Sequence, residues 1–209
     1  MPMLEIETPH GPANVHLHPA DDPVAALVLG HGAGGGVTAP DLVAATDVAR
    51  GQGLSVALVE QPYRVAGRRS PAPARQLDAA WIAVLTRLRD QELEGLPLIA
   101  GGRSLGARVA CRTAAVAGAV AVLCLAFPLL PPRRSGPPKS RIDELDQVTV
   151  PTLVVQGDRD RFGTPPPRPA RTVVTVPGDH SLRADTEAVA GAVAEWLPTV
   201  AGQTASAAR

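Results

Sequence analysis

The chain has 209 residues, of which 45% are hydrophobic and 19% are charged, and its 20 basic side chains balance its 20 acidic ones. This composition is typical of a folded globular protein, and the charge balance argues against broad nucleic-acid binding. No apolar run reaches the ~20 residues that span a bilayer, and residues 1–9 carry acids but no basic segment of a secretory signal. We therefore expect a cytoplasmic protein without a membrane partner, in which Cys111 and Cys124 are buried free thiols.

Strands and helices are predicted to alternate along the chain. Residues 4–8 and 13–18 predict an N-terminal antiparallel hairpin around His10-Gly11-Pro12. Further on, strands are predicted at 24–29, 54–59, 96–100, 119–126, 152–156 and 171–176, and helices at 40–50, 75–91, 107–117, 142–147 and 184–196. Such alternation is typical of an α/β fold, a mostly parallel sheet with helices on both faces. We expect one such domain over residues 1–198, followed by a flexible tail over residues 199–209.

The pentapeptide Gly102-Arg103-Ser104-Leu105-Gly106 lies between a predicted strand and a predicted helix. A Gly-x-Ser-x-Gly sequence in that position predicts a sharp turn that exposes the serine, because side chains at the two glycine positions would collide with the neighbouring strand and helix. The serine is then expected to have a strained backbone conformation. On its own, the pattern is also compatible with an ordinary tight turn that carries a surface serine.

Acidic and histidine side chains follow the last two predicted strands. Gly157-Asp158-Arg159-Asp160 comes after one strand and Asp179-His180 after the next. Because ligands bind at the carboxyl ends of the strands in a parallel sheet, these groups and Ser104 are expected to meet. A serine needs a base to take its proton as it attacks, and an acid orients the imidazole that serves as the base. We therefore predict Ser104 as nucleophile and His180 as acid/base, with the orienting acid in residues 157–160.

The oxyanion that forms during such an attack needs fixed hydrogen-bond donors. One donor is expected to be the backbone N–H of Leu105, the residue after the serine. The other is expected in the glycine-rich segment 30–36, which follows the strand predicted at 24–29. Within that segment we predict Ala33, with Gly34 as the next candidate.

Basic loops are predicted along the same edge of the sheet. They contain ten basic residues, namely Arg64, Arg68, Arg69, Arg103, Arg133, Arg134, Lys139, Arg159, Arg161 and Arg168. A basic rim of this kind would attract an anionic substrate, although an arginine-rich composition explains the same residues equally well. From these loops we expect four residues to contact substrate: Arg103, Arg68, Arg69 and Tyr63.

The glycine-rich segment has a rival interpretation. Gly30, Gly32 and Gly35 satisfy Gly-x-Gly-x-x-Gly after a strand, and Glu60 ends the next strand, where a dinucleotide-binding fold has its ribose-binding acid. A phosphate cradle needs a helix that begins at the glycines. Because the predicted helix begins only at residue 40, a nucleotide site is disfavoured.

His16 and His18 lie two residues apart on a predicted strand and therefore share one face, as a pair of metal ligands would. No cysteine, aspartate or third histidine accompanies them, so solvent-facing strand histidines are the better interpretation. We expect neither a metal nor a cofactor.

Four segments together resemble the α/β-hydrolase superfamily over nearly the whole chain: His31-Gly32-Ala33-Gly34-Gly35, 102–106, 157–160 and Asp179-His180. The chain also resembles the small lidless branch that includes testis-expressed-protein-30-like and dienelactone-hydrolase-like proteins. It is similar to the former group at Gln61-Pro62-Tyr63, Gly67-Arg68-Arg69, Phe127-Pro128-Leu129 and Val155-Gln156-Gly157. Dienelactone hydrolases use a cysteine nucleophile, whereas residue 104 is serine, so that substrate does not transfer. Only about two dozen residues separate Phe127 from Thr152, where lids are usually inserted, so we expect an open site.

The resemblance implies a serine hydrolase that cleaves small esters or thioesters through a Ser-His-Asp triad and an acyl-enzyme. In that family the acid is commonly the last residue of a Gly-x-x-Asp turn, which implies Asp160 rather than Asp158. Asp179 is then expected to bond within its own loop. The resemblance also admits a non-catalytic relative, in which the fold serves as an interaction module; a reactive serine distinguishes the two. It implies no particular oligomeric state.

Overall fold

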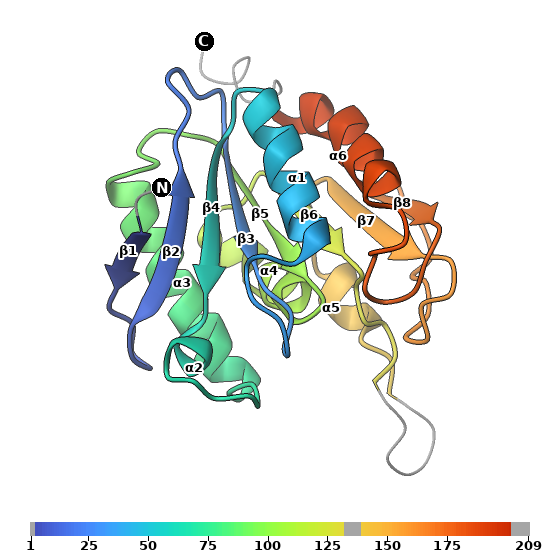
Figure 1. Cartoon of the computed structure of the whole chain (residues 1–209), viewed down its shortest axis with the longest axis horizontal. Coiled ribbons are helices and arrows are strands. Elements are labelled where there is room, and N and C mark those ends of the chain that lie inside the picture. Colours follow the sequence, from blue (N-terminus) through green and yellow to red (C-terminus); the bar gives the residue numbers. More distant parts are fainter. Residues whose placement is uncertain (1–2, 132–138, 202–209) are drawn as a thin grey trace.

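An eight-stranded sheet runs through the molecule in the computed structural model, which describes residues 3–131 and 139–201 (Figure 1). Its strands are β1 Met3–Ile6, β2 Ala13–His18, β3 Ala26–Gly30, β4 Ser55–Glu60, β5 Leu98–Arg103, β6 Ala121–Leu125, β7 Thr152–Gly157 and β8 Arg171–Val176. They lie in the order β1-β2-β4-β3-β5-β6-β7-β8. β2 pairs antiparallel with both β1 and β4, and the other neighbours pair in parallel. The predicted α/β fold, a mostly parallel sheet with an N-terminal antiparallel hairpin, is confirmed.

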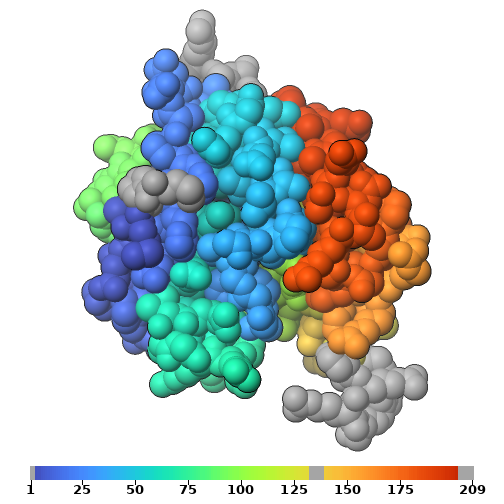
Figure 2. All heavy atoms as spheres, in the orientation of Figure 1, coloured from blue at the N-terminus to red at the C-terminus, as the bar shows by residue number. Residues whose placement is uncertain are grey.

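Helices cover both faces of this sheet (Figure 1). α1 Pro40–Gly51 and α6 Thr186–Ala201 lie on one face, and α3 Ala74–Asp90, α4 Leu105–Ala117 and α5 Ile142–Asp146 lie on the other. Alternate residues of a strand point to opposite faces. Leu27 and Leu29 of β3 therefore pack with Leu42 of α1 and Val193 of α6, whereas the residue between them packs with Trp81 of α3. The surfaces of α1 and α6 meet along the face shown in Figure 2.

Most element ends differ from the prediction by a few residues, one helix was not predicted, and the last helix is longer than predicted. The short helix α2 Pro62–Val65 falls in a segment predicted to be loop. α6 continues to Ala201, so residues 199–201 are helical and not part of a tail. The helix passes through Pro198, which has no N–H to donate to the carbonyl of Ala194. The side-chain amide of Gln52 donates to that carbonyl instead, at 2.9 Å.

Residues 202–209 of the predicted tail, and Arg133 and Arg134 of the predicted basic rim, lie outside the described residues. Within the described ranges, no helix is both long enough and apolar enough to cross a membrane. Cys111 and Cys124 are buried free thiols, as predicted.

Candidate active site

Ser104 lies on the sharp turn between β5 and α4. Its backbone φ of 52° and ψ of −103° are rare for a residue that carries a side chain, and such a conformation costs about 1–3 kcal/mol. A hydrogen bond from the Ser104 N–H to the carbonyl of Leu125 in β6, at 2.8 Å, holds the turn in place. The strain predicted for this serine is therefore present.

The glycines on either side of Ser104 allow two backbones to approach closely. Gly102 of β5 lies opposite Gly30 of β3 in the sheet. A Cβ atom on Gly102 or on Gly106 would overlap the backbone of Gly30. Helix α4 can therefore begin in contact with β3. Larger side chains at residues 102 and 106 would collide with the backbone of β3, as predicted.

We expect Gly106→Ala to lower the free energy of unfolding by about 3 kcal/mol or more, because the added methyl group meets the backbone of Gly30. Gly191→Ala is the matched control. Gly191 also lies in a helix, but nothing lies within 4 Å of an added Cβ, so the free energy of unfolding should rise by about 0.5–1 kcal/mol. Urea unfolding of the three proteins measures both changes, and similar effects of the two substitutions would contradict the close approach.

Ser104, His180 and Asp160 form one continuous line of hydrogen bonds. His180 Nε2 lies 2.9 Å from Ser104 Oγ, and His180 Nδ1 lies 2.7 Å from Asp160 Oδ2. An ionised carboxylate only accepts hydrogen bonds, so Nδ1 donates and Nε2 is left to accept from the serine hydroxyl. The side chain of Asp160 is fully buried. Its oxygens also accept from Gln156 Nε2 at 2.7 Å and from the Phe162 N–H at 2.9 Å.

The two other candidate acids bond to groups other than the imidazole of His180. Asp158 Oδ1 accepts from the N–H of Gly178 at 2.8 Å, and 45% of its side chain is exposed. Asp179 Oδ1 accepts from the hydroxyl of Ser181 at 2.6 Å and from the Ser181 N–H at 2.8 Å, and these hydrogen bonds lower the pKa of Asp179. Of the three carboxylates in these turns, Asp160 is the one that the fold brings to the imidazole of His180.

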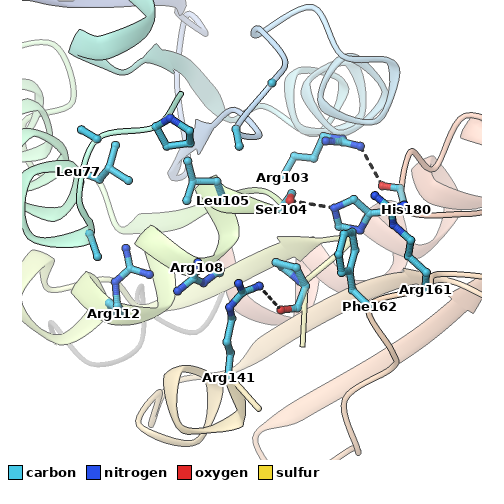
Figure 3. A pocket seen from close by; sticks show the side chains of 16 residues that line it. Leu77, Arg103, Ser104, Leu105, Arg108, Arg112, Arg141, Arg161, Phe162 and His180 are labelled. Carbon is cyan, nitrogen blue, oxygen red and sulfur yellow. Dashed lines mark hydrogen bonds between the residues drawn. The ribbon is translucent and has the colours of Figure 1, made fainter. Parts of the chain in front are cut away.

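Arg103, which was predicted to contact substrate, is held by the protein itself. Its Nε lies 2.9 Å from Oδ2 of Asp41, a fully buried carboxylate of α1. Its Nη2 donates to the backbone carbonyl of His180 at 2.8 Å (Figure 3). Burial raises the pKa of Asp41, and the nearby guanidinium opposes that rise. Arg103 borders the cavity beside Ser104, but its contacts tie the His180 loop to α1.

The glycine-rich loop after β3 is anchored by His31. The His31 Nδ1 donates to the carbonyl of Gly32 at 2.7 Å, and Nε2 accepts from the N–H of Gln61 at 3.1 Å. This pattern requires a neutral ring, and burial lowers the pKa of His31. Ala33 and Gly34 of the loop border the same cavity as Leu105. Leu105 is the first residue of α4, so its N–H has no acceptor within the helix.

The glycine-rich loop does not open a helix, because α1 begins only at Pro40. The glycines therefore lack the helix N-terminus that would face a bound pyrophosphate. This agrees with the argument against a dinucleotide site. The strand histidine His16 lies 3.3 Å from Glu60 Oε2, the acid that such a site would use.

Because of His31, the free energy of unfolding is expected to decrease as the pH is lowered. Its folded-state pKa lies below the value of about 6.5 in the unfolded chain. The unfolded chain therefore takes up a proton first, and stability that is present above about pH 6.5 is lost as the pH falls toward the folded-state pKa, at up to about 1.4 kcal/mol per pH unit. Urea unfolding between about pH 7.5 and about pH 5 should show a shallower loss for His31→Gln than for the wild type. Identical slopes would show that His31 does not carry this effect.

A cavity of about 460 Å³ opens beside Ser104 and His180 (Figure 3). The ring of Phe162 lies edge-on to that of His180, with 4.4 Å between the centroids. Leu77 of α3 and Arg161 of the predicted basic rim also border the cavity. Three further arginines, which were not predicted to belong to the site, also border the cavity: Arg108, Arg112 and Arg141.

Three residues predicted to contact substrate are not brought to Ser104. Tyr63 is buried, and its hydroxyl donates to the carbonyl of Ala33 at 3.0 Å. Tyr63 and Arg68 border a separate hollow of about 80 Å³, and Arg69 borders neither this hollow nor the larger cavity. The position of Tyr63 differs from the prediction because the chain after β4 forms helix α2, and Tyr63 in this helix contacts the glycine-rich loop instead of the cavity.

A family model described as an alpha/beta hydrolase domain matches residues 23–196, and no functionally curated protein matches the chain in sequence. A lidless α/β serine hydrolase from Xanthomonas campestris has a similar structure, with 21% identity, a TM-score of 0.74 and coverage of 95% of this chain and 94% of that one. Dienelactone hydrolase from Anabaena variabilis is 16% identical, with a TM-score of 0.75 and coverage of 95% of this chain and 97% of that one. An esterase domain from a Rhodothermus marinus protein is 19% identical, with a TM-score of 0.65 and coverage of 96% of this chain and 99% of that one. These three share the fold. Because the family model spans most of its length, the chain belongs to the α/β-hydrolase family, with the architecture of a lidless member.

Proposed function

We propose that the protein is a serine hydrolase that cleaves small carboxylic esters or thioesters through an acyl-enzyme. The observation that carries the proposal is the line of hydrogen bonds from buried Asp160 through His180 to Ser104, which ends at an open cavity of about 460 Å³. The family to which the chain belongs, and the hydrolases that share its fold, agree with this chemistry.

Each residue of the line has one role. As Ser104 Oγ attacks the ester carbonyl carbon, His180 Nε2 takes the hydroxyl proton, and Asp160 holds the ring and stabilises the imidazolium. The imidazolium then gives the proton to the departing alcohol or thiol, which leaves the acyl group on the serine. A water molecule attacks this acyl group in the same manner, releases the carboxylic acid and restores Ser104.

The oxyanion formed in both steps needs two fixed donors. We propose the backbone N–H groups of Leu105 and Ala33, with Gly34 as the alternative to Ala33. Their position on the wall of the cavity beside Ser104 supports this assignment. The hydrogen bonds of His31 and Tyr63 support it further, because they fix the loop that carries Ala33.

A fluorophosphonate probe tests the proposed function against a non-catalytic interaction module. An activated serine displaces fluoride and forms a phosphonyl ester, which mass spectrometry locates on a peptide. We expect labelling at Ser104 and none in Ser104→Ala. Ser181→Ala is the matched control, because Ser181 lies next to His180 in sequence but bonds to Asp179, and it should label like the wild type. Folded protein that is not labelled at Ser104 would favour the interaction module.

A further inference from the structure

One wall of the cavity is formed by arginines that follow Ser104 along α4. Arg108 and Arg112 lie four and eight residues after the serine, so they lie along the same side of the helix. Arg108 makes two hydrogen bonds to Glu144, at 2.6 and 2.8 Å. Arg112 pairs with Asp78 in the same bidentate manner, through its Nε and Nη2. Each of these two charges on the wall is thus matched by a carboxylate of the protein.

Arg141 borders the same cavity without such a partner. It lies just before α5, and its Nη1 donates to the backbone carbonyl of Pro128 at 2.9 Å (Figure 3). No carboxylate of the described residues forms an ion pair with it. Residues 1–2, 132–138 and 202–209 contain no aspartate or glutamate that could supply one. Arg141 therefore places a positive charge on the cavity wall that no aspartate or glutamate of the described residues pairs with directly, and the nearest acid, Glu144, already makes two hydrogen bonds to Arg108.

The surroundings of Arg141 make this charge ready to receive an anion. Burial and the neighbouring Arg108 lower the pKa of Arg141, and Glu144 opposes this in part, so an anion bound beside the guanidinium would stabilise its charge. The hydrogen bond to Pro128 orients the guanidinium, and it is the one hydrogen bond that the guanidinium makes to residues 3–131 and 139–201. A planar fork of donors matches the two oxygens of a carboxylate. Arg161, the other cavity arginine without an ion pair among the described residues, is exposed and lies over the ring of Phe162.

Resting on the proposed function, we infer that Arg141 is the specificity-determining residue of this cavity and binds a carboxylate carried by the substrate. The preferred substrates are then short esters with one ionised carboxylate, such as half-esters of small dicarboxylic acids. The ester carbonyl lies at Ser104 while the carboxylate pairs with the Arg141 guanidinium.

The test compares monoethyl glutarate with ethyl pentanoate, in which a methyl group replaces the carboxylate. The measured quantity is the ratio of the two kcat/KM values from pH-stat titration, since a general folding defect cancels in this ratio. We expect the wild type to prefer the half-ester by about tenfold or more, and Arg141→Gln to reduce the ratio by about tenfold. Arg141→Lys should keep part of the preference, because it retains the charge without the fork. Arg161→Gln, which removes an exposed charge, should change the ratio by less than about threefold.

A wild-type ratio near one, or the same ratio in Arg141→Gln as in the wild type, would overturn the inference. An equal reduction by Arg161→Gln would replace it with a diffuse field from the basic rim. If neither ester is hydrolysed, or if Ser104→Ala hydrolyses both, the proposed function fails instead. Calorimetric titration with free glutarate then decides the inference separately: binding about tenfold weaker in Arg141→Gln supports it, and equal or absent binding overturns it.

Discussion

Ser104→Gly is expected to lower ester turnover by about 10⁶-fold and yet to unfold less readily than Ser104→Ala. Both substitutions remove the proposed nucleophile. They differ in the backbone, since alanine keeps a Cβ in the rare conformation of φ 52° and ψ −103°, whereas glycine adopts it without that strain. Glycine also raises the entropy of the unfolded chain, which offsets part of this gain. The free energy of unfolding of the glycine variant should therefore exceed that of the alanine variant by about 1 kcal/mol.

Urea unfolding of the two variants, together with ester turnover above the buffer rate, measures both effects. Equal stability of the two variants would show that the backbone of Ser104 stores no strain. Turnover close to that of the wild type in either variant would remove Ser104 from the mechanism.

Asp160→Ala is expected to lower kcat by about 10⁴-fold. The variant removes the group that holds Nδ1 of His180, so the ring loses both its orientation and the stabilisation of its imidazolium form. It also leaves the amide of Gln156 and the N–H of Phe162 without an acceptor at this position. We therefore expect a lower free energy of unfolding as well, by about 1–3 kcal/mol.

Asp158→Ala is the matched control for Asp160→Ala. It removes a carboxylate from the same turn, but that carboxylate bonds to the N–H of Gly178 rather than to His180. We expect less than about a tenfold loss in kcat, through slight loosening of the loop. Comparable losses in the two variants would contradict the role of Asp160. A larger loss in Asp158→Ala would transfer that role to Asp158.

The sequence predicted most of the fold because its buried strands are continuous apolar runs that end at glycine, proline or charged residues. Helix α2 was not predicted, because a helix of four residues is too short to show a helical period in the sequence. The end of α6 was not predicted either. Pro198 disfavours a continued helix, and the side chain of the distant Gln52 supplies the donor that the proline lacks.

The approach of Ser104, His180 and an acid of residues 157–160 was predictable because the carboxyl ends of parallel strands meet at one edge. The family resemblance, and not this geometry, pointed to Asp160 as that acid. The arginine wall was not predicted, although one signal was present. The four-residue spacing from Ser104 to Arg108 and Arg112 places all three along one side of a helix. Arg141 gives no such signal, since its direction depends on a hydrogen bond to the Pro128 carbonyl. The directions of loop side chains such as Tyr63 likewise depend on tertiary contacts.

The hydrogen bond from Gln52 to Ala194 also bears on the order in which the chain folds. It joins residues 142 positions apart, and contacts with so large a separation form only after the chain between them is organised. No local hydrogen bond from residue 198 can take its place at the Ala194 carbonyl, because proline has no N–H. We therefore expect the amides at the end of α6 to be among the last to gain protection from hydrogen exchange during refolding, and among the first to lose it in the native protein.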